Sequence, residues 1–180
     1  LRKQVMAAVA ALGYAPDPNA RALASARSDV IGVIIPSLTN SVFSDVLTGM
    51  YDALADAPYQ IHFANNHFSP FEEERLIAGF IRQKPAALIV AGFDQTEQGR
   101  ALLRQAACPV VQIMETGDDP IDMVVGFSQR AAGAAVTQHL IEAGYRRIGF
   151  LGARMDPRTL RRLDGFRAAL TEAGLYDAGR

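Results

Sequence analysis

The sequence predicts an α/β protein built on a doubly wound parallel sheet. Short runs of β-branched residues alternate along the chain with segments that carry apolar residues at helical spacing. Such regular alternation is typical of βαβ crossovers, which place successive strands parallel to one another. The run at 31–36 is β-branched almost throughout, as expected for a strand that is buried on both faces of a sheet.

Composition and charge narrow the class of protein. The 180 residues are 49% apolar and 21% charged, which is ordinary for a globular protein of one large domain or two small ones. No apolar run approaches the roughly 20 residues of a membrane-spanning helix, and no secretory segment opens the chain, so we expect a cytoplasmic protein. The single Cys108 excludes an internal disulfide and agrees with a reducing compartment.

Two helices are expected before the first strand. Residues 1–12 carry apolar side chains at helical spacing, and Gly13 is suited to end that helix. The helix has no cap and no partner element, so we expect it to be the end of a domain that starts earlier. Asp17 and Pro18 are suited to begin a second helix through Ala24, which is too short and polar to be stable alone.

From residue 29 onward the expected elements alternate in order. Each expected helix has an apolar face, and glycines follow the last two. The expected strands span 31–36, 59–64, 87–91, 110–114, 123–126 and 147–151, and the expected helices span 43–56, 72–83, 96–106, 128–143 and 158–173. The loop after the first strand, residues 37–43, carries hydroxyl and amide side chains at the edge where open α/β sheets bind ligands.

Motifs of common enzyme and nucleotide sites are absent from the sequence. The loop at 37–43 has no glycine with which to approach a phosphate, and no G-x-S-x-G nucleophile motif occurs. The histidines have no metal-type spacing with one another or with Cys108. The acidic run at 72–74 fits the positive end of a helix dipole better than acid/base chemistry. We therefore expect no enzyme, no metal and no cofactor, although an α/β sheet can host chemistry without a known motif.

Five stretches in the expected order resemble the lactose/galactose repressor family. They are residues 2–24 running into 31–36, and residues 85–90, 108–111, 139–152 and 162–166. The resemblance covers the whole chain and implies a periplasmic-binding-protein-like core of two lobes that close on a small effector.

The same resemblance implies a division of the chain into three parts. Residues 1–28 correspond to the end of a helix-turn-helix DNA-binding domain and its hinge helix, residues 29–146 to the first lobe, and residues 147–180 to the start of the second lobe. We therefore expect the chain to be part of a longer repressor.

The resemblance assigns DNA contacts to the hinge helix in the minor groove. The residues concerned are Asn19, Ala20, Arg21 and Leu23, with Leu23 as the wedge between base pairs. An apolar side chain on a marginal, positively flanked helix agrees with this role. The alternative is that Leu23 docks on the core or on a partner's hinge. We expect a homodimer on double-stranded operator DNA, because a palindromic site mirrors a two-fold symmetric protein.

The effector site implied by the resemblance combines the loop at 37–43 with an arginine of the last helix. The candidate residues are Ser37, Asn40, Phe43, Phe127, Arg154, Arg158 and Arg162. Arg162 is suited to grip a carboxylate or vicinal hydroxyls with two parallel hydrogen bonds. Its alternative is a solvated helix arginine.

Several of these candidates also have structural alternatives. Arg154 and Arg158 either add positive charge to the cleft or form surface ion pairs with Asp156 and Asp164. Phe43 either stacks on the effector or packs in the core. Asn40 either binds a hydroxyl, caps the following helix, or does both. The role of Phe127 is less defined than theirs.

Within the family, three stretches look most like repressors of gluconate utilisation. These are residues 35–43, 125–127 and 151–159, and their surplus of arginines is consistent with a sugar-acid effector. Two other classes of protein compete with this interpretation. A sugar-binding protein of a transport system shares the two-lobed core but is disfavoured by the missing export signal. An enzyme with His67 or Asp94 as acid/base group is more distant still.

Overall fold

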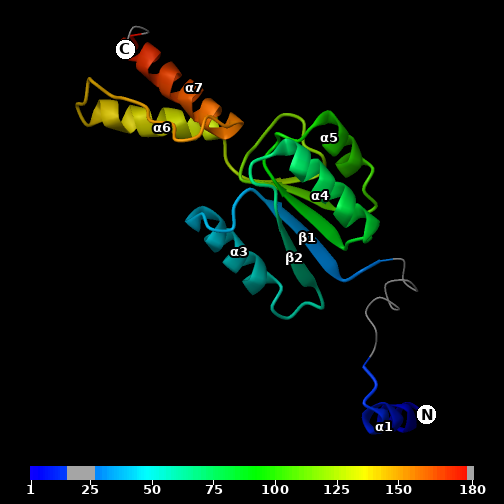
Figure 1. Ribbon diagram of the computed structural model, residues 1–180. Coiled ribbons are helices and arrows are strands. Elements are labelled where there is room, and N and C mark those ends of the chain that lie inside the picture. The colour runs from blue at the N-terminus through cyan, green and yellow to red at the C-terminus, as the bar shows by residue number, and fades with distance from the viewer. Residues whose placement is uncertain (16–26, 178–180) are drawn as a thin grey trace.

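The computed structural model describes residues 1–15 and 27–177, and its centre is a five-stranded parallel sheet in the order β2-β1-β3-β4-β5 (Figure 1). The strands are β1 (Val30–Ile35), β2 (Gln60–Asn65), β3 (Ala87–Ala91), β4 (Val110–Ile113) and β5 (Met123–Val125). The described helices are α1 (Arg2–Leu12), α3 (Ser41–Ala53), α4 (Pro70–Arg82), α5 (Glu97–Arg104), α6 (Gln129–Glu142) and α7 (Pro157–Glu172). The predicted doubly wound parallel sheet is confirmed. The predicted hinge residues Asn19, Ala20, Arg21 and Leu23 lie outside the described ranges.

The first strand has the central position that its sequence predicts. β1 pairs in parallel with both β2 and β3, and Val33 lies between Phe63 and Ile89 in the register. The side chains of Val33, Ile34 and Ile35 are fully buried. A strand covered on both faces exposes no side chain to water, which explains its continuous β-branched run.

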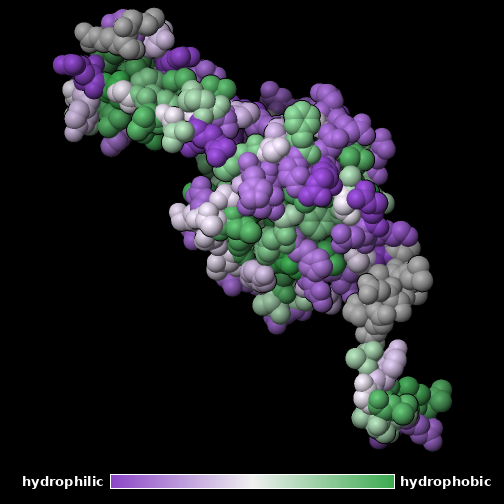
Figure 2. Space-filling model, viewed as in Figure 1, coloured by the Kyte–Doolittle hydropathy of each residue, from purple (hydrophilic) through white to green (hydrophobic). Residues whose placement is uncertain are grey.

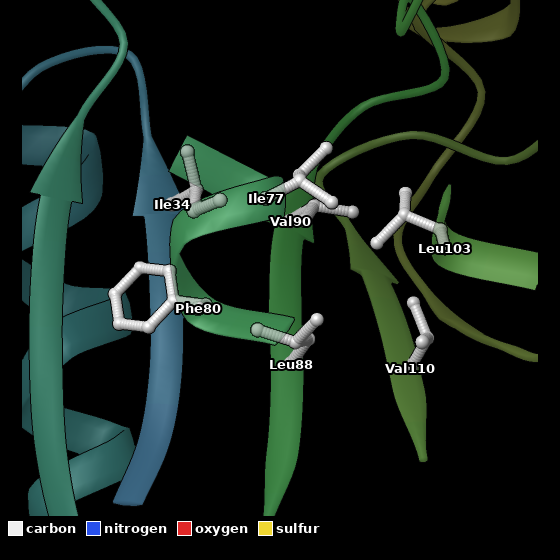
Figure 3. Packing of buried hydrophobic residues seen from close by; sticks show 7 residues of the cluster. All are labelled: Ile34, Ile77, Phe80, Leu88, Val90, Leu103 and Val110. Atoms are coloured by element: carbon white, nitrogen blue, oxygen red, sulfur yellow. The ribbon is translucent and has the colours of Figure 1, made fainter. Parts of the chain in front are cut away.

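Helices cover both faces of the sheet. On one face, α4 and α5 pack over a cluster that Figure 3 shows from close by, made of Ile34, Ile77, Phe80, Leu88, Val90, Leu103 and Val110. On the other face, α3 buries Phe43 against Val33 and Ile35, and partly buries Val46, Leu47 and Met50. Adjacent residues of β1 point to opposite faces, so one short strand supports both helical layers.

The last two described helices pack against each other rather than on the sheet (Figure 1). Glycines allow their close approach: a side chain at Gly133 would meet the backbone of Arg162, and one at Gly165 would meet the backbone of Arg130. Figure 2 shows apolar surface over this helix pair, and Val136 and Leu160 are among its exposed side chains. The predicted boundary at residue 146 stays a prediction.

One predicted strand is wrong. Residues 147–151 form no strand, and Leu151 is 95% exposed. Apolar alternation indicates a strand only where a neighbouring strand supplies backbone partners, and none lies beside this segment within the described residues. The helix ends also shift by a few residues, because α3, α4, α5, α6 and α7 begin after the side-chain caps Asn40, Ser69, Thr96, Ser128 and Asp156.

Among the described residues, no helix is long and apolar enough to span a bilayer. Helix α1 ends at Gly13 in the left-handed conformation, as its sequence predicts, and none of its residues is buried.

Candidate functional site

A cleft of about 570 Å³ opens where the carboxyl edge of the sheet faces the segment that leads into α7. The sheet side of its wall consists of Asn40, Val42, Phe43, Phe68, Met114, Phe127 and Gln129. The opposite side consists of residues 150–154 with Asp156, Arg158, Thr159 and Arg162. Six of the seven predicted effector residues therefore line one cleft, although they come from distant parts of the sequence.

Ser37 is the predicted residue that does not line this cleft. Its hydroxyl lies 3.3 Å from the hydroxyl of Thr39 and accepts a hydrogen bond from the backbone N–H of Asn40 at 3.2 Å. These contacts stabilise the turn between β1 and α3. In this structure Ser37 thus shapes the loop, while Asn40 and Phe43 face the cleft.

Both alternatives for Asn40 and for Phe43 are compatible with the structure. The side-chain oxygen of Asn40 accepts the N–H of Val42 at 3.1 Å and so caps α3, while the residue also lines the cleft. Phe43 is 3% exposed and belongs to the core under α3, yet it forms part of the same wall. The helix cap therefore fixes the position of a polar group at the rim.

An aromatic ring holds two of the cleft arginines. The guanidinium carbon of Arg154 lies 4.3 Å from the ring centroid of Phe68, and that of Arg158 lies 5.7 Å from it. Such cation–π contacts orient the guanidinium without neutralising its charge. Within the described chain neither arginine pairs with Asp156 or Asp164, so the surface-pair alternative is wrong. Asp156 instead caps α7 through the N–H of Thr159 at 2.9 Å.

The third cleft arginine, Arg162, lies one helical turn after Arg158 and so shares a face of α7 with it. The cleft wall thus carries three arginines against one aspartate. The N-terminal turn of α7 also faces the cleft, and its dipole adds positive potential. An anion, or a ligand with an anionic group, is the chemistry that this wall favours.

Phe68 and Met114 are site residues that the sequence analysis missed. Both have left-handed backbones, with φ of 61° and 72°. Asn66 stabilises the first of these turns, because its side-chain oxygen accepts the N–H of Phe68 at 3.1 Å. Strained backbone of this kind is concentrated at ligand sites. Their positions in the sequence could have indicated them, because both residues follow strands whose carboxyl ends lie at the same sheet edge.

Comparison with known proteins agrees with this geometry. Residues 28–178 match the family described as periplasmic binding proteins and sugar binding domain of LacI family. The chain belongs to this family. The predicted family is therefore confirmed, and the cleft lies within the matched residues.

Regulators of the LacI family are among the most similar proteins. The chain is 40% identical over 179 residues to the HTH-type transcriptional regulator GntR of Pseudomonas aeruginosa, covering 99% of the chain and 52% of that protein. It is 34% identical over 175 residues to GntR of Escherichia coli K12, covering 97% and 53%. The chain spans about half the length of these relatives.

Solved structures of the LacI family give the same picture. A LacI-family transcriptional regulator from Silicibacter pomeroyi superposes with a TM-score of 0.87 at 41% identity, covering 97% of this chain and 53% of that one. The transcription regulator GntR from Chromobacterium violaceum superposes with a TM-score of 0.77 at 44% identity, covering 83% and 55%. These names favour a regulator of transcription over a transport protein.

One of the two acid/base candidates of the enzyme alternative, Asp94, is engaged in an ion pair in this LacI-family chain. Asp94 accepts a hydrogen bond from Arg161 at 2.7 Å, whereas the contact of His67 with Asn65 at 2.9 Å is made by its backbone N–H and not by its imidazole. Glu73 is buried and accepts a hydrogen bond from Gln95 at 3.2 Å, and its burial raises the pKa of its carboxyl to about 7. Within the described ranges no group of His, Cys, Asp and Glu is arranged to hold a metal ion.

Proposed function

We propose that the chain is part of a cytoplasmic transcriptional repressor that binds operator DNA as a homodimer and is controlled by a sugar-acid effector. The observation that carries this proposal is the cleft with three arginines in a chain of the LacI family. Transcriptional control is supported by the similarity of the chain to transcriptional regulators named GntR. Effector binding would change the relative position of the lobes, and a coupling of about 1–3 kcal/mol is enough for useful regulation.

The wall chemistry supports a sugar acid over a neutral sugar. Arg162 lines the cleft and is suited to grip a carboxylate with two parallel N–H donors, while Asn40 offers an amide to a hydroxyl group. Arg154 and Arg158 add positive charge, held in place by Phe68. A six-carbon sugar acid such as gluconate combines one carboxylate with a chain of hydroxyls and is our proposed effector. Ser37 would act through the loop rather than by contact, and Phe127 would close the apolar side.

Titration of the full-length protein with gluconate and with glucose tests the effector class. Isothermal calorimetry is expected to show saturable binding of gluconate and much weaker binding of glucose, because only gluconate supplies a carboxylate. Arg130→Gln is the matched control, since Arg130 is exposed on α6 and lies outside the cleft lining. Equal affinities for the two compounds, or no binding of either, would contradict the sugar-acid proposal.

The DNA-binding half of the proposal rests on the hinge residues Asn19, Ala20, Arg21 and Leu23. Leu23→Ala is expected to lose most operator affinity while effector binding is unchanged, because the wedge that opens the base step is shortened. Leu23→Met keeps an apolar wedge and is the control. Fluorescence anisotropy with operator DNA gives the measurement, and wild-type affinity in Leu23→Ala would refute the wedge role. The division at residues 28 and 146 is proposed on the same family likeness.

A further inference from the structure

A separate group of charges joins α7 to the sheet edge beside the cleft. Arg161 is distant in sequence from Asp94 and Glu115 but contacts both in the folded chain. Its Nη2 donates to Oδ1 of Asp94 at 2.7 Å, and its Nη1 donates to Oε2 of Glu115 at 3.4 Å. Asp94 and Glu115 come from the loops after these two strands. Arg161 does not belong to the cleft lining, although its neighbour Arg162 does.

Glu115 also holds the start of α6. This buried carboxylate accepts the backbone N–H of Gln129, the first residue of α6, at 3.2 Å, and that of Thr116 at 3.0 Å. The side chain of Gln129 in turn donates to the carbonyl oxygen of Met114 at 2.9 Å. A single side chain on the sheet edge thus contacts the first turn of α6 directly and α7 through Arg161.

The two helices act as one unit because Gly133 and Gly165 allow their backbones to touch. Fixing this unit at Glu115 and Asp94 therefore fixes its tilt against the sheet. Since Arg158 and Arg162 are carried by α7 and Asn40 by the sheet edge, the tilt sets the separation of the two cleft walls. A buried carboxylate is costly to leave unpaired, so Glu115 favours the arrangement in which Arg161 is present.

We propose that Arg161 is a positioning residue for the effector: its bonds to Asp94 and Glu115 hold α7 at the tilt where Arg158 and Arg162 face the same ligand as Asn40. The effector part of this inference rests on the proposed function. The geometric part does not, because it concerns the ligand-free chain. Without these bonds the α6–α7 unit would sample tilts that are more open than the one in this structure, which we call the closed tilt. The apparent affinity for the effector would then fall in proportion to the fraction of molecules that keep the closed tilt.

Distances between spin labels in the full-length protein test the geometric part. Labels are placed at the exposed positions Gln98→Cys on α5 and Glu172→Cys on α7, in a Cys108→Ser background. Double electron–electron resonance is expected to give a narrow distance distribution, which broadens toward longer distances when Arg161→Met is added. Asp94→Asn keeps the shape of the side chain but removes its charge, and it is expected to broaden the distribution as well.

Control variants separate positioning from a general loss of charge. Arg161→Lys retains a cation and is expected to restore part of the narrow distribution. Arg167→Gln removes an exposed arginine of the same helix and is expected to leave the distribution unchanged. Unchanged distributions in both Arg161→Met and Asp94→Asn would overturn the inference, as would equal broadening by Arg167→Gln.

A gluconate titration of the same variants tests the effector part. Arg161→Met is expected to weaken binding roughly tenfold, as follows if the closed tilt falls to about a tenth of the molecules. Unchanged affinity despite broadened distances would overturn the link between tilt and binding. If the wild type bound no gluconate while the distances still broadened, the effector class would be wrong and the geometric role of Arg161 would be supported.

Discussion

The guanidinium of Arg154 lies 4.3 Å from the ring centroid of Phe68, which connects the segment before α7 to the loop after β2. Arg158 reaches the same ring at 5.7 Å. A cation–π contact leaves the N–H groups of a guanidinium able to donate to a ligand. The ring therefore orders two cations across the cleft that the proposed effector would occupy.

Replacing this ring should weaken effector binding without unfolding the protein. Phe68→Leu keeps an apolar side chain but removes the π face, so gluconate affinity is expected to fall about twofold to thirtyfold, the range of a cation–π contribution of about 0.5–2 kcal/mol. Calorimetry gives the measurement. Phe71→Leu is the matched control, because Phe71 is 79% exposed on α4 and lies outside the cleft lining. Equal losses in the two variants would argue against the stacking role.

Removing the guanidinium of Arg162 is expected to lower gluconate affinity more than Phe68→Leu does. Arg162→Gln loses a charged pair of donors, and the expected loss of gluconate affinity is roughly tenfold to a hundredfold, corresponding to about 1.5–3 kcal/mol for hydrogen bonds to a charged group. Arg162→Lys keeps the charge but not the fork and should lie between the two. A lysine variant as weak as the glutamine variant would point to geometry alone, and full affinity in Arg162→Gln would contradict a contact.

Glu73 should make the stability of the protein depend on pH. Burial raises its pKa from the ordinary value of 4.5 to about 7, so across this window the folded chain holds a proton that the unfolded chain releases. Stability contributed by Glu73 is therefore lost as the pH rises from about 4.5 to about 7. Glu73→Gln should remove this dependence and gain up to about 3 kcal/mol over the wild type above pH 7.

Urea unfolding at pH 5 and at pH 8 measures this effect. Glu97→Gln, in the exposed first turn of α5, is the matched control and should keep the wild-type pH profile. Parallel profiles for Glu73→Gln and the wild type would show that the buried carboxyl does not titrate in this window.

The crossing of α6 and α7 should not tolerate a methyl group. Gly165→Ala would place a Cβ against the carbonyl of Arg130, so thermal unfolding is expected at a lower temperature, with a loss of about 1–3 kcal/mol typical of overpacking. Gly49→Ala on α3 is the control, because nothing lies within 4 Å of its added Cβ. That control should gain up to about 1 kcal/mol from helix propensity. Similar changes in both variants would contradict the packing account.

The order of strands and helices was largely predictable from the sequence. The buried run at 31–36 and the apolar faces of the helices predict the parallel sheet, because burial on two faces or one leaves a clear periodicity. The strand expected at 147–151 failed for the opposite reason: a strand needs a paired neighbour, and local pattern does not report whether one is present.

The residues of the candidate site were likewise predictable only in part. The family likeness of single stretches was enough to select Asn40, Phe43, Phe127, Arg154, Arg158 and Arg162, which all line the cleft. It did not select Phe68, whose role depends on the distance between its ring and an arginine far along the chain.

The sequence by itself thus determined the fold class, the family and the positive charge of the site, because periodicity, motif order and residue type are local properties of the chain. The tertiary structure decided that Ser37 supports a turn, that Phe68 orders two arginines and that Arg161 joins α7 to Asp94 and Glu115. These relations depend on distances between residues that the folded sheet brings to one edge, and no local pattern contains them.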